Sequence, residues 1–216
     1  MTQFTLDPQF TIADEQALRS LFEPTHDLAI VKCQDHLDPH AQAFIQRSPF
    51  VCIGTQNADG KADVSPRGDP VGFVRILDTR TIAIPDRPGN NRLDSLVNIL
   101  ASPSVGLLFI IPGFDDTLRV NGRASLVTDP DLLETMTVNG RAPKLAIVVS
   151  VGEVFIHCAK AFRRARMWDP SQFQDRSEMP SLVKIILDQT TGAPENEDEM
   201  RKLDDDLEAD YKRTLY

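Results

Sequence analysis

The stretch that decides the fold is VSPRGDPVGFVRILDTRTIAIPDRPGNNRLDSLVN, residues 64–98. Two strand-like runs, residues 72–77 and 81–85, precede a polar loop, and an apolar pattern with helical spacing begins at Leu93. The loop contains two arginines and two asparagines, namely Arg87, Asn90, Asn91 and Arg92. A helix N-terminus attracts anions through its free N–H groups and its dipole, and arginine adds forked donors. The stretch therefore predicts a pocket for a phosphorylated ligand between a strand end and a helix.

Length and composition indicate a globular protein with a substantial core. The chain has 216 residues, of which 41% are hydrophobic and 25% are charged, and these values are ordinary for one domain with extensions. Its apolar stretches are too short to span a bilayer, and its N-terminus lacks the basic and apolar regions of a secretory signal. Three cysteines without a CxxC motif favour a reducing compartment. We expect a cytoplasmic protein that does not associate with membranes.

The net charge of −9 is concentrated in one segment near the end of the chain. Residues 195–210 contain nine acidic and two basic side chains, and the remaining chain is close to neutral. This excess of acid argues against a general affinity for nucleic acid. We interpret the segment as a solvated helix, with one apolar face formed by Met200, Leu203 and Leu207.

Hydrophobic periodicity predicts a β-rich domain flanked by helical segments. Asp14 is a candidate helix cap, and Pro39 suits the first turn of a later helix. Short strands with hairpin-like connections follow, including a turn at Asp59-Gly60, and Gly122 predicts a bulge within a strand. About six strands of this kind favour an antiparallel barrel with peripheral helices over a doubly wound parallel sheet. The expected organisation is an N-terminal helical extension at 1–48, a barrel at 49–170 and a C-terminal helical acidic tail at 171–216.

Four segments of the chain together resemble the pyridoxamine 5′-phosphate oxidase-like family of FMN-binding split-barrel proteins. They are SPRGDPVGFV at 65–74, IPDRPGNNRLDSLVNIL at 84–100, LRVNGRA at 118–124 and HCAKAFRRARMW at 157–168. The resemblance implies a mainly β protein with a six-stranded antiparallel split β-barrel. It further implies a homodimer that binds FMN without a covalent bond at the dimer interface, and an FMN-dependent oxidoreductase that acts on a small molecule.

The same resemblance implies which residues bind the cofactor. In the family, a strand with a basic residue, the end of a second strand and the loop that enters a helix grip the flavin phosphate. A later segment reaches the flavin of the partner. The matching positions here are Ser65, Arg67, Pro85, Asp86, Asn91, Arg92, Thr117, His157 and Lys160. The oxidases hold their substrate phosphate with a C-terminal motif that contains arginine, and no counterpart follows Trp168. The resemblance therefore does not extend to pyridoxamine phosphate as the substrate.

The residues taken alone leave two questions open. His157 follows an apolar strand, where a histidine is either a chemical group or a satisfied core residue. The second question concerns four basic residues, which either attract an anionic ligand or pair with the acidic tail. These are Lys160, Arg163, Arg164 and Arg166.

Neither catalysis nor a metal site can be assigned from residue spacing. No Ser/His/Asp or Cys/His arrangement is visible, so no catalytic residue is named. His26, His36 and His40 lack partners at metal-ligand spacing, so no metal site is expected. The alternative to an enzyme is a flavin-binding protein without turnover, or a protein that binds haem or a deazaflavin on the same barrel.

Overall fold

The computed structural model describes residues 4–216, and the chain falls into two compact units, Met1–Cys33 and Gln34–Tyr216. The first unit contains three short helices: η1 (Pro8–Phe10), α1 (Glu15–Arg19) and α2 (Asp27–Val31). The carboxylate of Asp14 accepts a hydrogen bond of 2.8 Å from the backbone N–H of Ala17, which confirms the predicted cap. Between residues 4 and 33 no side chain is buried.

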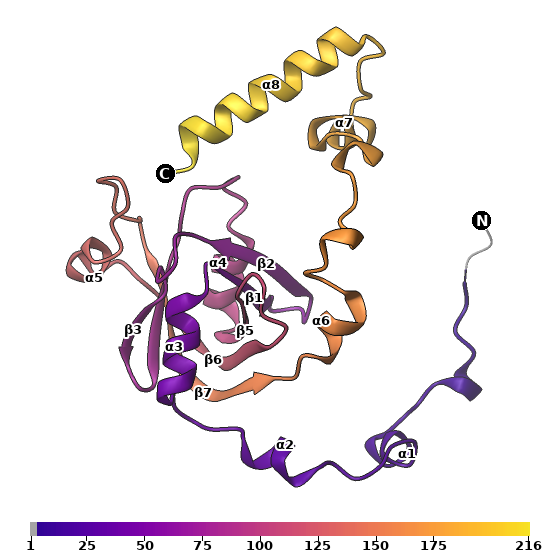
Figure 1. Ribbon diagram of the computed structural model, residues 1–216, viewed down its shortest axis with the longest axis vertical. Helices are drawn as coiled ribbons and strands as arrows, with labels where there is room; N and C mark the ends of the chain where they lie inside the picture. Colours follow the sequence, from indigo (N-terminus) through magenta and orange to yellow (C-terminus); the bar gives the residue numbers. More distant parts are fainter. Residues whose placement is uncertain (1–3) are drawn as a thin grey trace. The chain divides into compact units, whose positions relative to one another are not determined.

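The second unit is built on one antiparallel sheet of seven strands, in the order β2-β1-β5-β6-β7-β4-β3 (Figure 1). The strands are β1 (Phe50–Gln56), β2 (Ala62–Gly68), β3 (Arg75–Asp78), β4 (Thr81–Pro85), β5 (Ser104–Ile110), β6 (Thr117–Val127) and β7 (Ala146–His157). All neighbouring pairs are antiparallel, as the hairpin-like connections predicted. The expectation of a mainly β protein with peripheral helices is therefore confirmed.

The expected count of six strands is wrong. The sheet has seven strands, and its two edge strands, β2 and β3, do not pair with each other. The strand-like run expected at 72–77 forms β3, which has only four residues and whose register against β4 shifts between Ile76 and Asp78. The structure begins this strand three residues later than the sequence pattern does, and pairs it with β4 alone.

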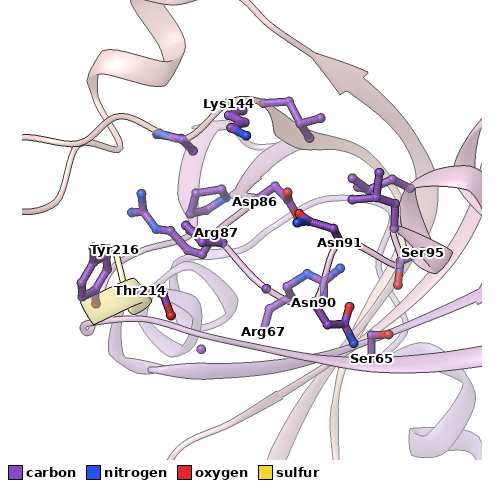
Figure 2. A pocket seen from close by; sticks show the side chains of 18 of the residues that line it. Ser65, Arg67, Asp86, Arg87, Asn90, Asn91, Ser95, Lys144, Thr214 and Tyr216 are labelled. Atoms are coloured by element: carbon purple, nitrogen blue, oxygen red, sulfur yellow. The ribbon is translucent and has the colours of Figure 1, made fainter. Parts of the chain in front are cut away.

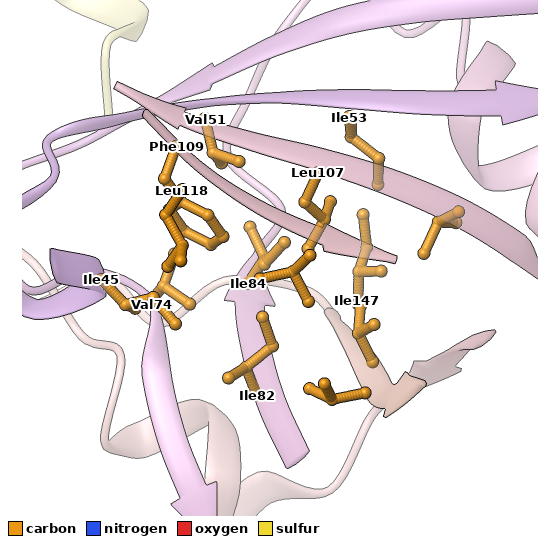
Figure 3. Close-up of a cluster of buried hydrophobic side chains, with 14 of the residues drawn as sticks. Ile45, Val51, Ile53, Val74, Ile82, Ile84, Leu107, Phe109, Leu118 and Ile147 are labelled. Carbon is orange, nitrogen blue, oxygen red and sulfur yellow. The ribbon is translucent and has the colours of Figure 1, made fainter. Parts of the chain in front are cut away.

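The core lies inside the curve of this sheet (Figure 3). Side chains from strands far apart in the sheet order belong to one buried cluster, which requires the sheet to curl around them. Twelve of the members are at most 1% exposed: Leu37, Ile45, Val51, Ile53, Ile82, Ile84, Leu107, Phe109, Leu118, Val120, Ile147 and Val149. At about 25 cal/mol per Å² of buried apolar surface, this cluster supplies the main stabilising term.

Helices cover the sheet and extend the chain beyond it. They are α3 (Pro39–Arg47), α4 (Asp94–Ala101), α5 (Pro130–Glu134), α6 (Lys160–Ala165), η2 (Pro170–Gln172), η3 (Arg176–Glu178), α7 (Leu182–Asp188) and α8 (Glu197–Thr214). Pro39 opens α3 as predicted, and Asp38 caps it. Helix α4 buries Leu96 and Ile99 against β1 and β6, which fixes the position of its N-terminus. Within residues 4–216, the structure contains no helix with both the length and the hydropathy needed to cross a membrane.

Two predicted backbone irregularities are confirmed. The turn at Asn57–Gly60 joins β1 to β2, with Gly60 at φ +82°, and the Asn57 side chain accepts from the backbone N–H groups of Asp59 and Lys61. The register of β6 against β7 shifts between Asn121 and Gly122, so a bulge lies where glycine interrupts the strand. The bulge bends the long hairpin that the core requires.

Candidate anion-binding site

A cavity of about 1300 Å³ opens beside the strand–loop–helix stretch at residues 64–98. Four segments line it: the end of β2, the loop from β4 into the start of α4, the turn before β7, and the C-terminal end of α8 together with Tyr216 (Figure 2). Six of the nine residues implied by the family resemblance line this one cavity: Ser65, Arg67, Pro85, Asp86, Asn91 and Arg92. The structure thus brings together residues that lie in two separate parts of the sequence.

The loop from β4 into α4 is restrained and strained. Asn91 and Leu93 both adopt left-handed backbone conformations, with φ of 57° and 60°. Asparagine tolerates this region, whereas leucine there costs roughly 1–2 kcal/mol. The side chain of Asn90 accepts a hydrogen bond of 3.0 Å from the backbone N–H of Arg92, which stabilises the turn. Strain of this kind is characteristic of ligand-binding loops, and here it fixes the approach to α4.

The N-terminus of α4 is open toward the cavity. Its cap is Leu93, which offers no side-chain hydrogen bond to the first-turn N–H groups. Asp94, Ser95 and Leu96 of the first turn all line the cavity. The guanidinium of Arg92 lies beside this turn and bonds to the Asp94 carboxylate at 2.8 Å. This arrangement provides free donors and a cation for an anionic group.

Arg67 lines the same cavity and carries a buried donor without a partner among the described residues. Its Nη1 donates to the backbone carbonyl of Pro66 at 2.9 Å. Its Nε is buried and has no hydrogen-bond partner within residues 4–216. A buried donor without a partner costs about 1–3 kcal/mol. An acceptor supplied by a ligand would recover that free energy.

The electrostatics of the cavity wall show its cationic character. Burial raises the pKa of the Asp86 carboxyl above its usual 3.8, while the charges of Arg67 and Lys144 act in the opposite direction. Two cations from different segments therefore lie near this one carboxylate, which is half-buried. Arg141 and Arg213 add further positive charge to the lining. The cavity suits an anionic ligand.

A polar network holds the end of β2 against α4. The carboxylate of Asp63 accepts hydrogen bonds from the hydroxyls of Ser65 at 3.3 Å and Ser95 at 3.1 Å. Thr55 also donates to it, at 3.4 Å, and accepts from the buried side chain of Asn98 at 3.0 Å. This network positions Ser65 and Ser95 on the cavity wall.

The opposite end of the cavity is closed by Tyr216. Its hydroxyl donates to Asp69 at 2.7 Å, and its ring centroid lies 5.7 Å from the guanidinium carbon of Arg87. Figure 2 shows Tyr216 and Thr214 on one side of the cavity and Ser95 on the other, with Arg67, Asp86 and Arg87 between them. The α4 end of the cavity therefore offers N–H donors and a cation, whereas Tyr216 at the other end bonds to a buried carboxylate.

Three of the implied cofactor residues lie outside this cavity. Thr117 is buried at the start of β6 and pairs with His157 at the end of β7. Lys160 is exposed at the start of α6. The question about the basic cluster is also partly answered, because Arg163 pairs with Asp115 and Arg166 with Asp169, neither of which belongs to residues 195–210.

Several residues that line the cavity are not among the site residues predicted from the sequence. Arg141 and Lys144 lie on either side of Pro143, in the turn before a long apolar strand. Two cations in one such turn could have indicated an anion-binding position. Tyr216 carried no local signal, because its partners lie far away in the sequence. No group of three or more His, Cys, Asp or Glu side chains in the described part of the chain is placed to hold a metal ion.

Comparison with known proteins places this site in a family context. A family model described as pyridoxamine 5′-phosphate oxidase matches residues 37–158, which is more than half of the chain. No curated protein matches. Similar solved structures include HupZ of Group A Streptococcus, an FMN-binding protein of Syntrophomonas wolfei, and HutZ, the heme storage protein of Vibrio cholerae.

These three likenesses are weak in sequence. The identities are 18%, 9% and 16%, and the TM-scores are 0.45, 0.42 and 0.41, in the same order. The alignments cover 56%, 61% and 56% of this chain, and 93%, 91% and 93% of the other chains. Identities this low do not extend a ligand or an activity to this protein.

Proposed function

Because the chain belongs to the pyridoxamine 5′-phosphate oxidase family, which residues 37–158 match, we propose that it binds FMN in the cavity and is an oxidoreductase. The observation that carries the proposal is the buried, unpartnered Nε of Arg67 in a cavity that also receives the open N-terminus of α4. A phosphate group satisfies both features at once.

The residues present fit this cofactor. The phosphate is assigned to the donors at the start of α4 together with Asn91, Arg92 and Arg67. The cavity, at about 1300 Å³, has room for much more than a phosphate. The cations near Asp86 suit a ligand that carries negative charge. When bound, FMN supplies the hydride chemistry, while the protein contributes binding, orientation and electrostatics.

The proposed reaction transfers electrons between the flavin and a small organic molecule. The cavity residues bind and orient the cofactor, and the strained loop at Asn91 and Leu93 holds the phosphate donors in place before binding. His157 and Lys160 lie outside the cavity of their own chain. In the proposal they approach the flavin of a second copy, as the family resemblance implies.

A homodimer is therefore part of the proposal, and an apolar stripe on α4 supports it. Leu93, Val97 and Leu100 recur at helical spacing and are 50%, 58% and 75% exposed. A stripe of large apolar side chains beside a candidate ligand site is typical of a protein–protein interface. Val97→Lys is expected to give monomers in sedimentation velocity. Leu77→Lys, at an exposed position on β3, is the control and is expected to sediment like the wild type.

The cofactor assignment is tested by the visible spectrum of the protein as isolated, and again after it is mixed with FMN and desalted. We expect the wild type to retain flavin absorbance, and Arg92→Ala and Arg67→Met to bind FMN about 10- to 100-fold more weakly, the cost of losing a charge-assisted hydrogen bond. Arg123→Ala removes an exposed arginine of β6 outside the cavity and serves as the control.

The outcomes separate the functions that the chain could perform. No retained flavin in the wild type would contradict the proposed cofactor. Equal loss of affinity in all three variants would contradict the assigned phosphate site. Retained flavin that NAD(P)H does not reduce, and that turns over no member of a substrate screen, would assign the chain as a flavin carrier.

A further inference from the structure

Tyr216 fills the end of the cavity opposite α4 and makes three specific contacts there. Its hydroxyl donates to Asp69 Oδ1 at 2.7 Å. Its ring centroid lies 5.7 Å from the Arg87 guanidinium carbon, within the range of a cation–π interaction. Arg141 donates to its main-chain oxygen. Tyr216 is thus held at its hydroxyl, at its ring and at its main-chain oxygen.

The groups that receive Tyr216 are fixed by the rest of the fold. The Asp69 side chain has no exposed surface, and its Oδ2 accepts from Arg87 Nε at 2.6 Å. Arg87 is 14% exposed, and its Nη2 also donates to the Met136 carbonyl at 2.7 Å. The strand and loop segments therefore hold this ion pair without help from α8. Its remaining carboxylate oxygen, Oδ1, receives the phenol.

The chemistry of this end selects a hydroxyl donor. A buried carboxylate oxygen that loses its donor is costly, and the cost is larger for a charged group than for a neutral one. A phenol meets this need, and its ring lies against a cation. The carboxylate of Asp69 raises the pKa of the Tyr216 phenol, which keeps the donating, neutral form bound. A phenyl ring without the hydroxyl lacks the decisive contact.

We propose that Asp69, Arg87 and Arg141 form a second subsite in the cavity, for a ligand that carries a phenol at one end and an oxygen acceptor or anionic group at the other. Tyr216 occupies this subsite as an internal competitor. The claim that this subsite takes a substrate rests on the proposed function. The claim that it binds a phenol does not. A ligand enters this subsite by displacing the residue.

The test uses the full-length Tyr216→Ala variant, which vacates the subsite, and two probes, N-acetyl-tyrosine and N-acetyl-phenylalanine. Isothermal titration is expected to show the tyrosine probe binding about tenfold more tightly or better, because only it donates to Asp69. Tyr211→Ala is the matched control, since Tyr211 is the exposed second tyrosine of the chain. This control retains the competitor and is expected to bind the tyrosine probe at least tenfold more weakly than Tyr216→Ala, because a tethered group acts at millimolar effective concentration.

Two results would overturn the subsite: equal affinity of the two probes for Tyr216→Ala, or no binding of either. Asp69→Asn in the Tyr216→Ala background is expected to abolish the preference for the tyrosine probe. If that double variant does not fold, the comparison of the two probes still decides. Flavin absorbance of the same samples is recorded separately, so loss of FMN binding would contradict the proposed function while probe preference still reports on the subsite.

Discussion

Arg87 and Asp69 form an ion pair that is almost wholly removed from solvent. Arg87 Nε lies 2.6 Å from Asp69 Oδ2, and the two side chains are 14% and 0% exposed. Arg87 belongs to the loop after β4 and Asp69 follows β2, two strands that are not neighbours in the sheet. The pair therefore joins the segment after β2 to the cavity loop after β4, and no backbone hydrogen-bond ladder connects these two strands.

This burial predicts a large cost when one partner is removed. Arg87→Met leaves the Asp69 carboxylate buried without its cation, and is expected to lower the free energy of unfolding by about 3–5 kcal/mol. Arg92→Met breaks an ion pair whose side chains are 73% and 44% exposed, and is expected to leave the free energy of unfolding almost unchanged, because solvent screens the pair. Urea unfolding of both variants measures the difference. Similar losses in the two would show that the buried Arg87–Asp69 pair does not hold the segments after β2 and β4 together.

Alanine substitutions at Gly122 and Gly152, two glycines of the same hairpin, are expected to differ in their effect on stability. A Cβ at Gly122 would lie 2.2 Å from the Ser150 carbonyl oxygen, so Gly122→Ala forces β6 and β7 apart. We expect a loss of about 3 kcal/mol or more in unfolding free energy. At Gly152 the nearest atom is 3.6 Å away, and Gly152→Ala is expected to remain within about 1 kcal/mol of the wild type. A mild effect at Gly122 would mean that the bulge relaxes easily.

Local signals in the sequence were sufficient for much of this fold. The cap at Asp14, the turn at Gly60 and the bulge at Gly122 depend on backbone preferences of single residues, so they were predictable. The run at 72–77 was recognised as strand-like, but β3 begins only at Arg75, where its pairing with β4 starts, and that boundary depends on the partner strand. Whether the sheet closes depends on the meeting of its two edges, which no local pattern encodes.

In the candidate site, too, the features that depend on neighbouring residues were predictable, and those that depend on distant residues were not. The loop containing Asn91 and Arg92 lies next to its helix in the sequence, so an anion site could be predicted there without any knowledge of the tertiary structure. The contact of Tyr216 with Asp69 joins the end of the described chain to the end of β2, and it depends on how the chain returns after α8. A single tyrosine after an acidic helix gives no indication of such a partner.

Replacing Asp86 with asparagine is expected to stabilise the protein by an amount that depends on pH. Burial raises its pKa above 3.8, so the folded state binds the proton more tightly than the unfolded state. The stability contributed by this group is fully present below pH 3.8 and is lost as the pH rises through the folded pKa. Asp86→Asn is therefore expected to melt at a higher temperature than the wild type at pH 7, with a difference that narrows toward pH 4. A difference that is independent of pH would show that Asp86 titrates normally.

Replacing Asp94 with asparagine is expected to lower stability and to raise the affinity for FMN. Its carboxylate holds Arg92 at 2.8 Å and adds negative charge to the first turn of α4, where the phosphate is assigned. Asp94→Asn frees the guanidinium and is expected to tighten FMN binding about two- to fivefold, the value of an exposed pair. The same change removes a favourable interaction with the helix dipole and is expected to lower stability by about 0.3–1 kcal/mol.

The matched control for this last prediction is Asp198→Asn. Asp198 also lies in the first turn of a helix, α8, and pairs with Arg201 at 3.2 Å, but it does not line the cavity. It is expected to lose a similar small amount of stability without any change in FMN affinity, as measured by quenching of flavin fluorescence. Unchanged or weaker FMN binding in Asp94→Asn would place the phosphate away from Arg92 and would leave Arg67 as its principal cation.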